Sequence, residues 1–186
     1  MHRMLLVSGV VAVMIVTGAM MALTLSPAAS SVHLKGGKNA EPSFTDNGLS
    51  LSADGEISGL GNGDVLIEIE AEADVTSTCT NRGGNAAPGQ NPAPITVIGS
   101  VSILDEEKKN GNTPFSVTTI PPDPEIPGAP DCPNPNWTES IDDLAFTSAT
   151  ISVHQGGSLV LTVDCSFDPP TSDGAVSKQD VSCTQT

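Results

Sequence analysis

The feature that most constrains this chain is a regular alternation of aliphatic and polar residues from Asp64 to Cys79. Every second residue from Val65 to Val75 is aliphatic, and most of the residues between them are carboxylates. Because successive side chains of a β-strand point to opposite faces, the pattern predicts one long strand with a buried face and an acidic, solvated face. Such a strand must pair with other strands, and its apolar face must be covered by a second layer. The pattern therefore predicts a β architecture for the domain.

Shorter segments follow the same rule. We expect strands in "APITVIGSVSIL", "PFSVTTI", "LAFTSATISVH", "LVLTVDCSF" and the terminal "QDVSCTQT". Asp54-Gly55 in "LSLSADGEIS" predicts a tight hairpin turn, and Gly99 predicts a bulge in its strand. The segment from Pro121 to Pro135 predicts a long connection, because proline lacks an amide hydrogen and fixes φ.

After the N-terminal segment, no apolar pattern at helical spacing extends beyond about two turns, so we predict an all-β domain. Several strands without a regular repeat favour an antiparallel two-sheet sandwich, immunoglobulin-like or of a related Greek-key type. A closed barrel is the alternative. With 4 Phe, 1 Trp and no Tyr, the core is built mainly from aliphatic residues.

Residues 1–31 have the pattern of a secretory signal peptide. An apolar run from Met4 to Leu25 is followed by small residues, which predicts cleavage between Ala28 and Ser31. The run is long enough for an uncleaved anchor, which is the alternative. Both interpretations place a single domain, residues 32–186, outside the membrane, because Arg3 favours a cytoplasmic N-terminus. We expect a secreted protein or, alternatively, one held at the cell surface by this segment.

The four cysteines, Cys79, Cys132, Cys165 and Cys183, all lie in the exported part. An even number in an oxidising compartment predicts two disulfides, and the long spacings argue against a zinc site. Cys165 and Cys183 flank one loop between two strands, which favours pairing them and leaves Cys79 to Cys132. Two other connectivities remain open.

The formal net charge is −15, and removal of the N-terminal segment takes away Arg3 and no acid. A nucleic acid partner is therefore excluded, because its phosphates would be repelled. An anionic membrane surface is disfavoured for the same reason. The high charge favours a soluble monomer.

The sequence predicts no catalytic residues, no metal site and no cofactor. The octet "GNAAPGQN" (84–91) resembles a phosphate-binding loop, but it lacks the Lys-Ser/Thr pair and precedes a predicted strand, so we interpret it as a flexible connector. An extracellular hydrolase is the alternative function, using either a serine with His154 or an acidic pair. The candidate carboxylates are Asp142 with Asp143, Asp105 with Glu106 and Glu107, and the row Glu68, Glu70, Glu72 and Asp74.

The acidic row could also attract Ca²⁺, although no calcium-loop motif is present. A solvated acidic face is the simpler interpretation. Trp137, near Cys132, either covers a disulfide or is exposed as a binding residue. Asn136 begins the sequon "NWT" and would be a surface acceptor in a host with N-glycosylation.

The phrases "VHLKGGKNAEPSFTDNGLSLSADGEISGLGNGDV", "CTNRGGNAAPGQNPAP" and "CPNPNWTESIDDLAFTSATI" resemble small secreted proteins of unknown function from bacteria such as actinobacteria. The resemblance covers nearly all of residues 32–183 and implies no activity or site residues. We therefore hypothesise a secreted or envelope-associated, non-enzymatic β-sandwich. It would be a structural or binding module whose partner is another protein or a surface polymer.

Overall fold

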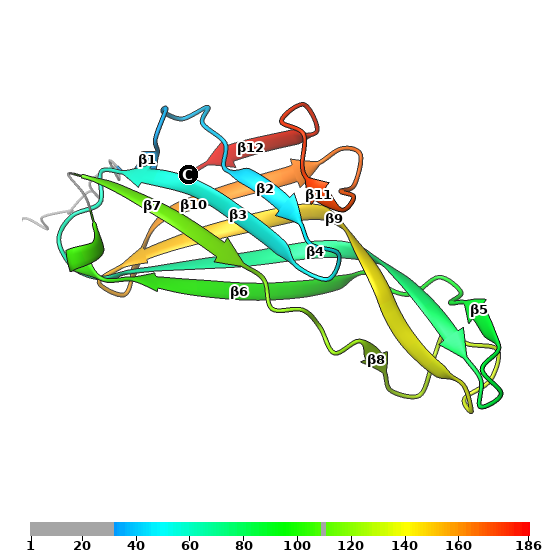
Figure 1. Ribbon diagram of the computed structural model, residues 1–186. Coiled ribbons are helices and arrows are strands. Elements are labelled where there is room, and N and C mark those ends of the chain that lie inside the picture. The colour runs from blue at the N-terminus through cyan, green and yellow to red at the C-terminus, as the bar shows by residue number, and fades with distance from the viewer. Residues whose placement is uncertain (1–31, 109–110) are drawn as a thin grey trace, which may run out of the picture.

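The computed structural model describes residues 32–108 and 111–186, so the predicted signal peptide lies outside the described residues. The described chain is all-β, with two antiparallel sheets packed together, as predicted (Figure 1). Its one helical element is η1, a 3₁₀ turn at Asp105–Glu107. Among the described residues, no helix has the length and apolar character needed to cross a membrane.

The first sheet, sheet A, is organised around β3. Strands β1 and β2 pair with opposite ends of β3 along one edge, and β7 pairs with its other edge. A short β11 extends the sheet beyond β2. The strands are β1 (His33–Leu34), β2 (Ser43–Asp46), β3 (Leu51–Ser58), β7 (Asn112–Thr118) and β11 (Gly174–Ala175).

The second sheet, sheet B, is organised around two long strands that pair with each other, β4 and β9. The first half of β4 also pairs with β6, and the second half of β9 with β10, which in turn pairs with β12. At the other end, β5 pairs with β4 and β8 with β9. The strands are β4 (Val65–Thr80), β5 (Ala86–Pro88), β6 (Ile95–Ile103), β8 (Glu125–Ile126), β9 (Thr138–Gln155), β10 (Ser158–Phe167) and β12 (Val181–Gln185).

The hydrophobic core lies between the sheets. The predicted alternation of β4 is confirmed: Ile67 and Ile69 are buried, whereas Glu68 and Glu70 are exposed. The inward residues of the two sheets form one cluster, in which the rings of Phe44 and Phe167 meet edge to face with centroids 5.0 Å apart. Burial of aliphatic and phenyl side chains therefore holds the sandwich together.

Two predicted details are wrong. Strand β3 runs straight through Asp54-Gly55, and the turn falls instead at 47–50, where the Asn47 amide donates to the Ser50 carbonyl. Gly55 has another role, since a Cβ there would lie 2.7 Å from the Phe115 ring. Gly99 pairs in regular register with Ile69 and forms no bulge. A Cβ at Gly99 would lie 2.0 Å from the Thr118 carbonyl oxygen, so glycine permits the close approach of β7.

Beyond the sandwich, β4 and β9 continue together as an arm (Figure 1). We call residues 74–91 and 121–144 the arm and the rest of the described chain the body. The pairing of β4 with β9 shifts register at Glu72/Ala73 and at Thr76/Ser77, where the arm begins. Such irregularities bend a strand and increase its twist, which explains why the arm diverges from the sheet.

Both disulfides form with the favoured connectivity. Cys165–Cys183 joins directly paired residues of β10 and β12 in the body. Cys79–Cys132 joins the end of β4 to the proline-rich connection in the arm. No cysteine is free in the described chain.

Candidate binding site at the tip of the arm

The arm is a single sheet, so its inner face needs a cover other than a second sheet. The connection 121–137 supplies it, and the Cys79–Cys132 disulfide attaches this connection to β4. The Asp131 carbonyl also accepts a hydrogen bond from the Gln90 amide at 3.0 Å. The cover is therefore attached to β4 and to the segment after β5, while β8 within it pairs with β9.

Under this cover lies a buried carboxylate that the sequence analysis did not identify. Glu139 is fully buried, and its two oxygens accept hydrogen bonds from the Ser77 hydroxyl at 2.8 Å and the Asp131 amide at 3.2 Å. A buried carboxylate without donors would be costly, so these two bonds are needed to keep Glu139 inside. The interior of the arm is thus partly polar.

The octet 84–91 is more ordered than the predicted flexible connector. Ala86–Pro88 forms β5 against β4, and the Gly89 amide donates to the Ser77 carbonyl at 2.8 Å. A Cβ at Gly89 would lie 1.9 Å from the Ser77 hydroxyl oxygen, so this position needs glycine. The octet is a structural edge of the arm, and β5, not a helix, occupies it.

Two turns meet at the end of the arm, residues 81–85 and 133–137, which we call the tip. In the first, the Asn81 side-chain oxygen accepts hydrogen bonds from the amides of Gly83 and Asn85, both at 2.9 Å. In the second, the Asn134 side-chain oxygen accepts from the Asn136 amide at 2.9 Å. Asparagine side chains therefore shape both turns.

The tip encloses a shallow hollow of about 290 Å³ that combines one aromatic ring with several polar groups. Its lining residues are Asn81, Arg82, Gly83, Asn134, Asn136 and Trp137. Trp137 is half-buried, whereas Arg82 and Asn136 are exposed. Trp137 and Asn136 were singled out by the sequence. Arg82 was not, although it is the only arginine after Arg3 and could have been noticed for that reason.

Of the predicted hydrolase residues, Glu68 and His154 lie together, whereas Asp142 and Asp143 lie elsewhere. His154 Nε2 is 3.2 Å from a Glu68 oxygen on the outer face of the body. Asp142 accepts a hydrogen bond from the Thr78 hydroxyl in the arm. Thr78 and Glu68 are ten residues apart on one strand, which corresponds to roughly 33 Å. Asp143 lies near Gly48 and the buried Asp46. Glu68 and His154 therefore line one hollow together with Ser102, whereas Asp142 and Asp143 lie elsewhere.

The acidic row Glu68, Glu70, Glu72 and Asp74 is exposed along β4, as predicted. In the described part of the chain, no three His, Cys, Asp or Glu side chains are grouped so that they could hold a metal ion. Asp105, Glu106 and Glu107 form η1, at the end of the body opposite the arm.

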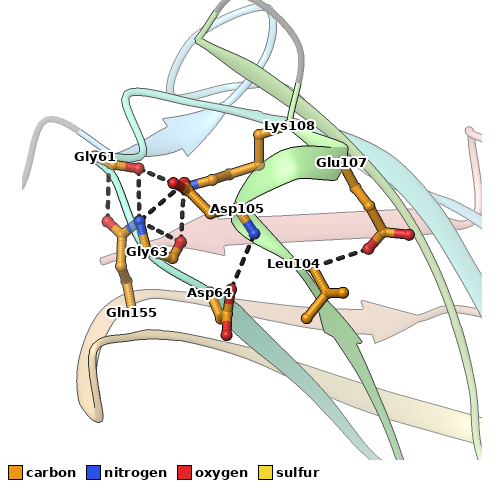
Figure 2. Close-up of polar contacts among 8 residues, drawn as sticks. All are labelled: Gly61, Gly63, Asp64, Leu104, Asp105, Glu107, Lys108 and Gln155. Carbon is orange, nitrogen blue, oxygen red and sulfur yellow. Dashed lines mark hydrogen bonds and ion pairs between the residues drawn. The ribbon is translucent and has the colours of Figure 1, made fainter.

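That opposite end is closed by a polar cluster centred on Lys108 (Figure 2). The Lys108 ammonium donates to the carbonyl oxygens of Gly61 and Gly63, at 2.5 and 2.7 Å, and pairs with Asp105 at 2.7 Å. The hydrogen bond from Lys108, followed by one from the Gly63 amide, lowers the pKa of the Asp105 carboxyl. The polar groups of the cluster are bonded to one another, so the cluster has a structural role: it holds η1 against the 59–64 loop.

Comparison of the chain with protein-family models, with curated proteins and with solved structures finds no match. The geometry of the described residues is therefore the basis for any functional conclusion.

Proposed function

We propose that this protein is an exported, non-enzymatic binding module whose arm tip engages a sugar-bearing polymer of the cell surface. Export is suggested by the signal-like segment 1–31 and supported by the two disulfides, which are typical of oxidising compartments outside the cytoplasm. The observation that carries the proposal is the position of Trp137 and Arg82 together in the hollow at the tip.

The tip has the chemistry that neutral sugars require. An indole ring offers a flat apolar surface to the C–H face of a sugar, while amide and guanidinium groups exchange hydrogen bonds with its hydroxyls. Trp137 supplies the first, and Arg82 with Asn81 and Asn134 supplies the second. A polyanionic polymer is a poorer ligand, because the net charge of −15 would repel it at long range.

The placement of the tip also supports binding. Strand β4 extends over 16 residues from the Lys108 end of the body to the arm, a length of about 50 Å. Strand β1, where the described chain begins, pairs with the last residues of β3 at that same Lys108 end (Figure 1). The tip is therefore at the end of the domain opposite β1, where the described chain begins.

The hydrolase alternative is weaker on this geometry. General acid–base or nucleophilic catalysis needs groups that converge on one substrate position. Glu68, His154 and Ser102 border one hollow on the outer face of sheet B. However, Ser102 and His154 lie on the two strands that flank β4, about 10 Å apart, and Asp142 belongs to the arm. A binding role needs only the grouping that the tip already has.

The experiment is a fluorescence titration of the secreted domain, residues 32–186, with soluble fragments of neutral envelope polysaccharides from the natural host. Since the chain has one Trp and no Tyr, its fluorescence reports the tip alone. We expect a saturable change in emission, and calorimetric binding that is lost in Trp137→Ala and weakened in Arg82→Gln. The body variant Thr96→Ala is the matched control and should bind normally.

Two results would overturn the proposal. One is the absence of saturable binding to every neutral polysaccharide fraction. The other is calorimetric binding that Trp137→Ala leaves intact. Binding that depends on Trp137 but resides only in a protease-sensitive fraction would replace the sugar polymer with a protein partner.

A further inference from the structure

The outer face of sheet B carries a second feature that the tip does not explain. Its central row is formed by β4, whose outward residues read Leu66, Glu68, Glu70, Glu72 and Asp74. Directly across from Glu68 lie Ser100 of β6 and Ser152 of β9. Small hydroxyl residues thus flank Glu68, Ile98 lies across from Glu70, and both carboxylates are exposed.

Two hollows join along this row. One, of about 350 Å³, is lined by Glu68 and Glu70 together with Ile98 and Ile120. The other, of about 810 Å³, is lined by Leu66 and Leu104 and by three ionisable side chains, Glu68, Asp64 and His154. Because Glu68 borders both, the two hollows are adjacent over β4 and β6, and we call them together the groove.

The apolar wall of this groove is rigidly constructed. Ile98 and Ile120 are 61% and 69% exposed, more than any other large aliphatic residue in the described part of the chain. The Ile120 amide donates to the Ile98 carbonyl at 2.7 Å, which fixes the connection after β7 against β6. Gly99 permits this approach by its lack of a side chain. Water-exposed isoleucines held in place by the fold indicate a contact surface.

The charge of this face determines what can bind. Within the described strands of sheet B there is no lysine or arginine, and the only basic side chain on this part of the outer face is His154, which faces Glu68. A second copy would present carboxylates to carboxylates, and anionic lipid would be repelled. A metal ion is not supported either, because no three His, Cys, Asp or Glu side chains of the described residues lie close enough together to hold one. A cationic partner is the occupant that complements the groove.

We propose that this groove binds an extended basic segment of a partner protein, in which lysines at every second position follow a leucine. Alternate side chains repeat at about 7 Å both on β4 and in an extended peptide, so three lysines would match Glu68, Glu70 and Glu72. The leucine would then lie over Leu66 and beside Leu104. This site goes beyond the proposed function and does not depend on the tip.

The test uses calorimetry at low salt with the synthetic peptide acetyl-SLSKSKSKS-amide and residues 32–186. Binding should weaken as salt rises, and the variant Glu68→Gln/Glu70→Gln should reduce affinity roughly fivefold to tenfold. Ile98→Ser/Ile120→Ser should also weaken it. The control Asp54→Asn/Glu106→Gln removes the same charge elsewhere and should have little effect.

The proposal is overturned if acetyl-SLSESESES-amide binds equally well, if the control variant loses as much affinity as Glu68→Gln/Glu70→Gln, or if the basic peptide does not bind. Trp137→Ala should bind the peptide like the unmodified protein. This separates failure of the groove from failure of the tip.

Discussion

The body and the arm share the same two strands but are stabilised in different ways. In the body, the inward residues of β4 are Ile67, Ile69 and Ala71, which pack against the opposite sheet. In the arm, the inward residues of the same strand are Ser77 and Cys79, next to the buried Glu139. Where a second sheet is present, apolar burial provides the stability. Where it is absent, a disulfide and specific hydrogen bonds take its place.

The two disulfides reflect the same difference. Cys165–Cys183 joins neighbouring strands that are already hydrogen-bonded, with a sequence separation of 18. Cys79–Cys132 spans a separation of 53 and attaches a connection with little secondary structure. The Cys79–Cys132 disulfide therefore fixes the conformation of the connection 121–137, which its local contacts alone would not determine.

The largest expected effect is in the body core. Phe146 is fully buried in the sandwich, so Phe146→Ala should lower the free energy of unfolding by about 3–5 kcal/mol, because it removes buried surface and leaves a cavity. Urea unfolding followed by circular dichroism measures this. Thr96→Ala, on the exposed face of β6, should change it by less than about 0.5 kcal/mol.

Removal of one disulfide should affect mainly the arm, and removal of the other should affect mainly the body. In the chain-entropy model the loop of Cys79–Cys132 is worth about 4 kcal/mol and that of Cys165–Cys183 about 3 kcal/mol. Cys79→Ala/Cys132→Ala should speed hydrogen exchange throughout the arm and leave the unfolding midpoint of the body nearly unchanged. Cys165→Ala/Cys183→Ala should lower that midpoint. If Cys79→Ala/Cys132→Ala speeds hydrogen exchange equally in the body and in the arm, the two regions are not stabilised separately.

Within the arm, the buried carboxylate should matter next. Glu139→Ala leaves the Ser77 hydroxyl and the Asp131 amide without their acceptor, at a cost of about 1–3 kcal/mol. We expect faster exchange of the Asp131 amide and an altered Trp137 emission, with an unchanged body midpoint. Glu139→Gln keeps one oxygen acceptor and should give a smaller change. A fall in the body midpoint would show that the arm and body unfold together.

The smallest effect concerns Asp46, a buried carboxylate in the body. Burial raises its pKa, opposed by hydrogen bonds from Thr171 and the Gly48 amide and reinforced by Asp143 and Asp173. The Asp46 carboxyl therefore binds a proton more tightly in the folded protein than in the unfolded chain. Protonation of Asp46 stabilises the fold at low pH, and this stabilisation is lost as the pH rises from 3.8 through the raised pKa. Asp46→Asn should flatten this part of the stability profile in urea titrations at several pH values. If Asp46→Asn leaves the pH dependence of the free energy of unfolding unchanged, Asp46 does not have a raised pKa in the folded protein.

The sequence predicted the body well because its pattern is local. Alternation located β4, β6, β7 and β10, and the position of Cys165 and Cys183 around one loop indicated their pairing. The Asp54-Gly55 turn was wrong because the need for glycine at Gly55 comes from Phe115, which is distant in sequence. No local pattern could show that contact.

The arm was harder to predict for a physical reason. The alternation of β4 continues from the body into the arm without interruption, so nothing marks where the second sheet ends. Glu139 has the composition of a surface residue and is buried only because Ser77 and Asp131 lie beside it. Trp137 was noticeable for its rarity, but its neighbour Arg82 lies 55 positions earlier in the chain and joins it only in the folded arm.

The central claim is that this protein meets its ligand at the end of the arm. The most direct test is hydrogen exchange of residues 32–186 with and without a saturating amount of neutral envelope polysaccharide from the natural host. We predict slower exchange in the tip, residues 81–85 and 133–137, and unchanged exchange in the body strands β3 and β10. Protection that appears only in the body, with the tip unaffected, would contradict it.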